Sequence, residues 1–133
     1  MGFALKYLVS SKGEMLVESD VSEFLRSEAL KEINIFEIAR EVSEKAVFHF
    51  HEIYGIDDVR VIYEDLNFEI DSNRIIAYGK VHSSDIDKAQ SGSVYLISSS
   101  LIALWELTST MGMKTQGYRS IKNVNITAIE EMD

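Results

Sequence analysis

A β-hairpin set between two long helical segments is the feature that most limits what this chain can fold into. Residues Asp58–Ile70 alternate between apolar and polar, with a slip in phase between Tyr63 and Leu66 that predicts a β-bulge or a bend. Turn residues at 71–73 (DSN) follow, and Arg74–His82 (RIIAYGKVH) is predicted to be the return strand. The middle of the chain should therefore form two neighbouring antiparallel strands.

Helical periodicity dominates on both sides of this hairpin. From Asn34 to about Tyr54, apolar residues recur with the spacing of a helix that has one buried face. Asn34 is the expected N-cap of this helix, and Glu37 completes a capping-box pattern. The second helix is predicted over Ser93–Thr110, where apolar side chains cover most of the circumference, so it should be well buried.

Shorter pieces of regular structure complete the pattern: a strand over Phe3–Val9, a short return strand over Met15–Glu18, a helix over Ser22–Leu30 and a final strand over Tyr118–Ile129. Ser22 is the expected cap of the short helix. Segments of turn or loop composition connect these pieces: Ser11–Glu14, Ser83–Gly92 and Met111–Gly117.

The order strand, helix, two strands, helix, strand is that of the ferredoxin-like split βαββαβ arrangement, an α+β fold. It predicts an antiparallel sheet with the two long helices on one face. We expect a single domain over residues 1–133, in which a short strand and helix extension (1–33) precedes a ferredoxin-like core (34–133). The second face of the sheet then needs cover, which another subunit would supply, so we expect a homo-oligomer.

Composition limits the kinds of function that this chain can have. It has 13 Lys+Arg against 22 Asp+Glu, a formal net charge of −9, which argues against a protein that coats nucleic acid. It contains no cysteine, which excludes a disulfide scaffold, a thiolate metal site and a cysteine nucleophile. No apolar run approaches the roughly 20 residues of a membrane span, and Met1–Ser10 lacks a signal-peptide pattern. We therefore expect a cytoplasmic domain without membrane or nucleic-acid partners.

Two histidines near the end of the first long helix are candidates for chemistry. His49 and His51 are two positions apart and cannot share one face of a helix, so we expect no metal site there. If the helix continues, His49 falls on the apolar side as a partly buried histidine whose hydrogen bonds are satisfied. His51, which is followed by Glu52, is the better acid–base candidate.

Glu106 is a carboxylate inside an apolar helix, and two interpretations of it stay open. It is either a paired or solvated residue on the helix surface, which its residue type alone favours, or a carboxylate whose pKa is set by a pocket. The sequence has no glycine-rich phosphate loop and no GxSxG serine motif. The residues by themselves therefore give a fold and a short list of candidates, but no reaction.

Several segments together point to a known family. Ala46–Ile53 (AVFHFHEI) leads through Ile56–Val61 (IDDVRV) into the hairpin, and Ser99–Leu107 (SSLIALWEL) lies in the second helix. Ala46–Ile53 is similar to the segment Leu-Ile-Pro-Leu-Cys-His-Pro-Ile of the cyclic pyranopterin monophosphate synthases, the C proteins of molybdenum-cofactor biosynthesis. Ser99–Leu107 is similar to the segment Ala-Ala-Leu-Leu-Thr-Val-Tyr-Asp-Met of the same family. Gly117–Ile126 resembles the segment before that family's last strand, and Val17–Ile33 more faintly resembles its N-terminal region.

The resemblance implies a ferredoxin-like lyase that needs no cofactor. Members of the family rearrange a cyclised GTP-derived nucleotide to cyclic pyranopterin monophosphate and release pyrophosphate. They are hexamers, trimers of dimers, with their sites at subunit interfaces. His51 matches the motif histidine and Glu106 the motif aspartate, so these are the implied catalytic residues. The candidate substrate-binding residues are His49 and three lysines that could take the phosphate role: Lys31, Lys88 and Lys114.

Other functional residues of the family are missing here. Its Lys-Gly-Asp-Val segment before the first long helix is not recognisable. Ser109 stands in place of a family lysine, while Gln90 and Gly92 stand in place of two glutamates, and Lys88 and Lys114 are not at motif positions. Cations are needed to hold an anionic substrate and its leaving pyrophosphate. Two hypotheses follow: a synthase-like lyase with an eroded active site, or a non-catalytic, oligomeric relative that binds a pterin or a nucleotide.

Overall fold

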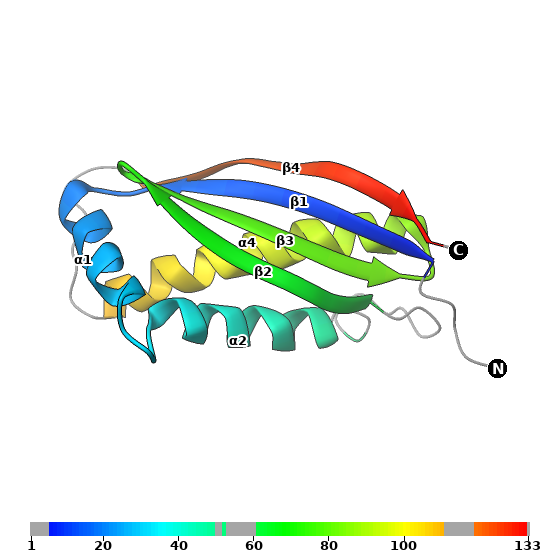
Figure 1. Cartoon of the computed structure of the whole chain (residues 1–133), viewed down its shortest axis with the longest axis horizontal. Helices are drawn as coiled ribbons and strands as arrows, with labels where there is room; N and C mark the ends of the chain where they lie inside the picture. The colour runs from blue at the N-terminus through cyan, green and yellow to red at the C-terminus, as the bar shows by residue number, and fades with distance from the viewer. Residues whose placement is uncertain (1–5, 50–51, 53–60, 111–118, 133) are drawn as a thin grey trace.

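The computed structural model describes residues 6–49, 52, 61–110 and 119–132. Figure 1 shows their path through the molecule. In chain order the helices and strands of these residues are β1 (Tyr7–Leu16), α1 (Ser19–Ala29), α2 (Ile35–Phe48), β2 (Val61–Asp71), β3 (Arg74–Ser83), α4 (Ile86–Thr110) and β4 (Ser120–Glu131).

The strands form one sheet in the order β2-β3-β1-β4, and every neighbouring pair is antiparallel. β1 and β2 therefore run parallel with β3 between them, and β3 and β4 run parallel with β1 between them. This is the split βαβ connection made twice, which is the ferredoxin-like arrangement of an α+β fold. The predicted fold class is confirmed.

The two long helices, α2 and α4, lie side by side on one face of the sheet, while α1 sits at the end near the β2–β3 turn (Figure 1). α4 packs closely over the sheet because glycines remove side chains at the contact. A Cβ atom on Gly13 of β1 would lie 2.6 Å from Ile97, and one on Gly92 of α4 would lie 2.6 Å from Val61. Apolar side chains from both layers fill the rest of the interface and form one buried core.

The N-terminal part of the chain differs from the prediction. Residues 7–16 form one continuous strand, so the turn at Ser11–Glu14 and the separate return strand at Met15–Glu18 are wrong. Gly13 suggested a turn, but it serves close packing against α4 instead. β1 is an interior strand of the sheet, so it belongs to the core rather than to an extension over residues 1–33. The first residues of the strand predicted over Phe3–Val9 lie outside the described part.

Helix boundaries also differ from the prediction. α4 begins at Ile86, so the loop expected over Ser83–Gly92 is wrong, and the Asp85 carboxylate accepts the backbone N–H of Lys88 at 3.0 Å as a cap. α1 begins at Ser19, which places Ser22 inside the helix rather than at its start.

The cap of α2 is confirmed, because the Asn34 side-chain oxygen accepts the N–H groups of Phe36 and Glu37 at 2.9 and 3.1 Å. α2 ends at Phe48, whereas the helix was expected to continue to about Tyr54. His49 follows as its C-cap, and the end of the predicted range lies outside the described residues.

The hairpin of β2 and β3 is confirmed, including its irregularity. The register between the two strands shifts between Tyr63 and Asp65, where the phase slip predicted a bulge or bend. Asp71 pairs with Arg74 across the turn, and Ser72 has a φ of 54°, in the left-handed region. The final strand runs two residues further than expected, to Glu131.

The face of the sheet away from the helices carries mostly polar side chains. Neighbouring positions on β1, β3 and β2 hold Lys12, Lys80 and Asp65, which are exposed, and Tyr78, which is 40% exposed. Water can solvate such side chains, so this face does not by itself require the second subunit that the sequence argument invoked. In the described ranges, no helix combines the length and the apolar content that crossing a membrane requires.

Candidate functional site

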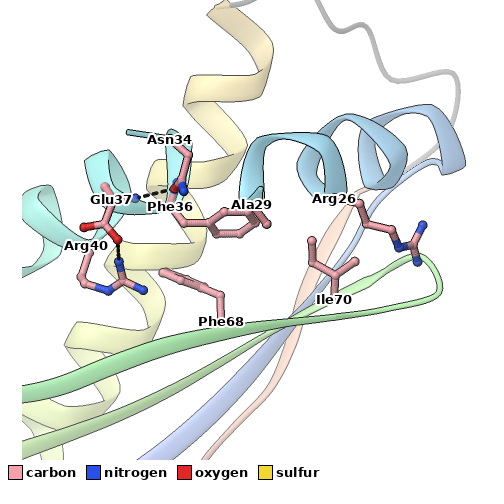
Figure 2. Close-up of a pocket in the computed structure, with 8 residues that line it drawn as sticks. All are labelled: Arg26, Ala29, Asn34, Phe36, Glu37, Arg40, Phe68 and Ile70. Carbon is pink, nitrogen blue, oxygen red and sulfur yellow. Dashed lines mark hydrogen bonds and ion pairs between the residues drawn. The ribbon is translucent and has the colours of Figure 1, made fainter. Parts of the chain in front are cut away.

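A cleft of about 360 Å³ opens between α1, the first turns of α2 and the inner face of β2 (Figure 2). Arg26 and Ala29 come from α1, and Phe68 and Ile70 come from β2. The remaining lining residues belong to the start of α2: Asn34, Phe36, Glu37 and Arg40. This volume lies within the range of small-molecule sites, which begins at about 300 Å³.

Two aromatic side chains form the apolar wall of this cleft. Phe36 is buried and Phe68 is half-buried, and their ring centroids lie 5.3 Å apart at an interplanar angle of 45°. Figure 2 shows the two rings between Arg26 at one end and the pair of Glu37 and Arg40 at the other. A planar ligand can stack against such a wall and gain dispersion and desolvation energy.

Arg40 is held at one end of the cleft by contacts from several sides. Its Nε donates to the Leu66 carbonyl oxygen at 2.8 Å, and its Nη1 donates to the Glu37 carboxylate. The guanidinium carbon lies 5.7 Å from the centroid of the Phe68 ring, in cation–π range. Nη2 has no hydrogen-bond partner among the described residues, so the guanidinium keeps donors for a ligand.

Arg26 stands at the other end, on the last turn of α1. Its Nη2 donates to the Ser72 carbonyl oxygen at 2.6 Å, which anchors the side chain to the β2–β3 turn. The same turn is tied to α1 by Ser22, whose Oγ donates to the Asn73 side-chain oxygen at 3.1 Å. These contacts place a second guanidinium at the rim of the cleft, so its lining combines two cations with one carboxylate.

The chemistry available in the cleft favours binding over proton transfer. Its lining, as far as the described residues go, contains no histidine, and its carboxylate, Glu37, is already bound to Arg40. The backbone N–H groups of Phe36 and Glu37 already donate to the cap residue Asn34, so the guanidiniums are the charged donors that the lining offers to an anion. The arrangement can hold a small molecule with a planar ring and at least one negative charge.

His49, the predicted residue that follows α2, is not part of the lining of this cleft. His49 is exposed, with 51% of its side chain accessible, so its predicted partial burial is wrong. The expected hydrogen bonding is present, because Nδ1 lies 3.0 Å from a carboxylate oxygen of Glu52. His51 lies outside the described residues, and so does Lys114.

The remaining predicted residues do not all meet at one site within one chain. Lys31 is exposed and forms an ion pair with Glu28 just before α2. Lys88 is in the first turn of α4 and Glu106 is near its end, so at 1.5 Å of rise per residue they are about 27 Å apart along the helix. Lys88 and Glu106 therefore cannot contact the same small ligand bound to a single protomer.

Glu106 lines a second cleft, of about 530 Å³, on the outer surface between α2 and α4. The other lining residues are apolar, aromatic or hydroxyl-bearing: Val42, Tyr95, Ser98, Ser99, Ile102, Ala103 and Leu107. Glu106 itself is exposed. This favours its interpretation as a solvated carboxylate on the helix surface, and the described lining offers no cation for a phosphorylated substrate.

The residues of the first cleft were not singled out from the sequence. Phe36 and Arg40 are four positions apart and so share one face of a helix, and Phe68 falls on the inward phase of its strand. Such spacing is common to any packed helix and strand, so it carries no signal for a ligand. Only the approach of α1 to the β2–β3 turn completes the site.

No protein-family model and no curated protein matches this chain. Within the described ranges there is also no group of three or more His, Asp or Glu side chains placed to hold a metal ion.

Proposed function

We propose that this protein binds a small anionic ligand with a planar ring, of the phosphorylated pterin or nucleotide class, in the cleft between α1, α2 and β2. The observation that carries the proposal is the placement of two guanidinium groups, from Arg26 and Arg40, at the two ends of one aromatic wall. Arginine suits this role because its planar fork donates two parallel hydrogen bonds to a phosphate or carboxylate.

The lyase chemistry implied by the sequence resemblance is less well supported by this geometry. That chemistry needs cations near the catalytic carboxylate to stabilise the leaving pyrophosphate. The described lining of the cleft around Glu106 provides none, and Lys88 lies about 27 Å away along α4. We therefore favour the binding function over turnover for a single protomer.

Calorimetric titration with guanosine monophosphate as the probe tests the binding function. We expect Arg26→Ala and Arg40→Lys each to weaken binding by about tenfold, because each removes donors to the anion. Glu37→Gln should strengthen binding several-fold, since its carboxylate competes with the ligand for Arg40. Lys45→Ala is the matched control: it removes an exposed cation from the same helix, outside the cleft lining, and should leave affinity unchanged.

Two further probes separate the parts of the ligand. Guanosine should bind more weakly than the monophosphate because it lacks the charge, and inorganic phosphate should bind more weakly because it lacks the ring. Equal affinity for guanosine and its monophosphate overturns the proposal. So does affinity for the monophosphate that is unchanged by both arginine substitutions.

A further inference from the structure

β4 ends the sheet on one side, and its outer edge is not paired within the described part of the chain. It is a long strand, Ser120–Glu131, that contacts β1 along its other edge. An unpaired edge presents backbone N–H and C=O groups that can pair with a further strand. The second edge of the described sheet is β2, so its four strands offer two places for such pairing.

The helix side of β4 is incompletely covered. α4 lies mainly over β1 and β3, and β4 receives less of its packing (Figure 1). Ile121, Val124 and Ile126 are therefore only partly buried, and Ile129 is 45% exposed. Apolar side chains next to a free strand edge favour a partner that covers both together.

Charge distinguishes β4 from β2 as an edge for self-pairing. β2 has four acidic residues and no basic one, so two antiparallel copies of β2 can form no ion pair with each other in any register. β4 has Lys122 near its start and Glu130 near its end, each four positions from Ile126. Two antiparallel copies of β4 can therefore bring unlike charges together at both ends.

We propose that a second copy of this chain pairs with β4. The two β4 strands run antiparallel about a two-fold axis at Ile126, and Lys122 of one copy lies opposite Glu130 of the other. The sheets join into one continuous sheet with four strands from each copy. The partly exposed apolar strips meet on the helix side and shield one another from water.

Irregularities in β4 restrict the choice of partner. Its register against β1 shifts between Ser10 and Ser11 and again between Lys12 and Glu14, and Asn123 has a φ of 56°. Bulges of this kind increase the local twist and discourage pairing with an arbitrary flat strand. A second copy of β4 has the same twist, so it is the strand that can follow this edge.

A charge-swap experiment followed by sedimentation equilibrium tests the pairing. Lys122→Glu and Glu130→Lys should each raise the dimer dissociation constant by about tenfold, because each creates two like-charged pairs. The double variant should return the constant to near the parent value. The two residues are eight positions apart on one strand, about 26 Å, so only contact between copies can produce this rescue.

Lys122 also lies opposite Glu14 on β1, so the charge variants could lose stability as well as dimerisation. Cysteine crosslinking gives a second readout that does not depend on how well those variants fold. The chain has no cysteine of its own, so single substitutions are unambiguous. Ile126→Cys should form a covalent dimer when oxidised with diamide, since residues on the axis face one another at disulfide distance. Asn67→Cys, on the β2 edge, is the matched control and should form no covalent dimer.

The proposal is overturned if the parent protein stays a monomer at about 100 μM, a concentration at which a dimer of even modest affinity is populated. It is also overturned if the double charge variant dissociates as readily as the single variants, or if Asn67→Cys and Ile126→Cys crosslink equally. None of these results bears on the ligand titrations, because the cleft with Arg26 and Arg40 lies beside β2, the opposite edge of the sheet.

Discussion

At the scale of single residues, Arg119 is the most tightly enclosed charge in the described part of the chain. Its side chain is fully buried, and its Nη1 donates to the Trp105 carbonyl oxygen at 3.1 Å and to the Thr108 hydroxyl at 2.7 Å. Its Nε lies 3.7 Å from a carboxylate oxygen of Glu18. Arg119 thus ties the start of β4 to the end of α4 and to the segment between β1 and α1.

Replacing Arg119 should destabilise the protein severely. Arg119→Met keeps much of the side-chain volume but leaves the largely buried Glu18 carboxylate without a cation, at an expected cost of about 3 kcal/mol in the free energy of unfolding. Urea unfolding followed by circular dichroism measures this loss. The double variant with Glu18→Gln should recover part of it, since no unpaired charge remains, and a double variant no more stable than Arg119→Met contradicts this explanation.

At the scale of elements, local periodicity predicted those parts of the fold that depend on the residues of a single segment. The hairpin, its bulge and the two long helices follow from the spacing of apolar residues within each segment. The continuation of β1 beyond Val9 was missed because Gly13 is typical of a turn, and its role became visible only with α4 in place above it. The start of α4 was missed because its first turns are polar, although Asp85 is a normal N-cap.

Gly92 provides a test of the contact between α4 and the sheet. Helix propensity alone predicts that Gly92→Ala stabilises the protein by about 1 kcal/mol. The added Cβ would lie 2.6 Å from a methyl group of Val61 and 3.4 Å from one of Val81, so we expect a net loss of about 1–2 kcal/mol instead.

The measurement is the unfolding midpoint in urea, with Ser91→Ala on the exposed side of the same helix as the control. Combining Gly92→Ala with Val61→Ala makes room for the methyl group and should recover stability relative to the sum of the two single effects. If Gly92→Ala raises the midpoint, propensity outweighs packing and the close contact is not a constraint.

At the scale of the whole molecule, the candidate site could not be predicted from the sequence. Arg26, Arg40 and Phe68 come from three elements and are unremarkable in their own segments. The resemblance directed attention to His51 and Glu106, of which only Glu106 lies among the described residues, and its cleft is apolar. A binding site that depends on how elements meet leaves little trace in the periodicity of any one of them.

The net charge of −9 should make stability depend on salt. Raising NaCl from about 0.01 M to about 0.15 M shortens the Debye length from about 30 Å to about 8 Å and weakens repulsion among the acidic groups. We expect the melting temperature to rise by a few degrees, measured by differential scanning calorimetry at neutral pH.

A charge variant serves as the control for this effect. Glu23→Lys, Glu32→Lys and Glu44→Lys together change exposed residues and bring the net charge from −9 to −3. The triple variant should show a smaller increase with salt than the parent protein. An equal increase in both proteins assigns the effect to salt acting on something other than the net charge.

The position of β1 in the sheet has a consequence for how the chain is made. Among the described strands β1 is synthesised before the others, yet it pairs with β3 and with β4, which is synthesised after the others. During translation it therefore waits with at least one unsatisfied edge while the intervening residues are added. The edge of β1 that faces β4 stays unpaired until Ser120–Glu131 has been synthesised, so the N-terminal elements cannot complete the sheet by themselves.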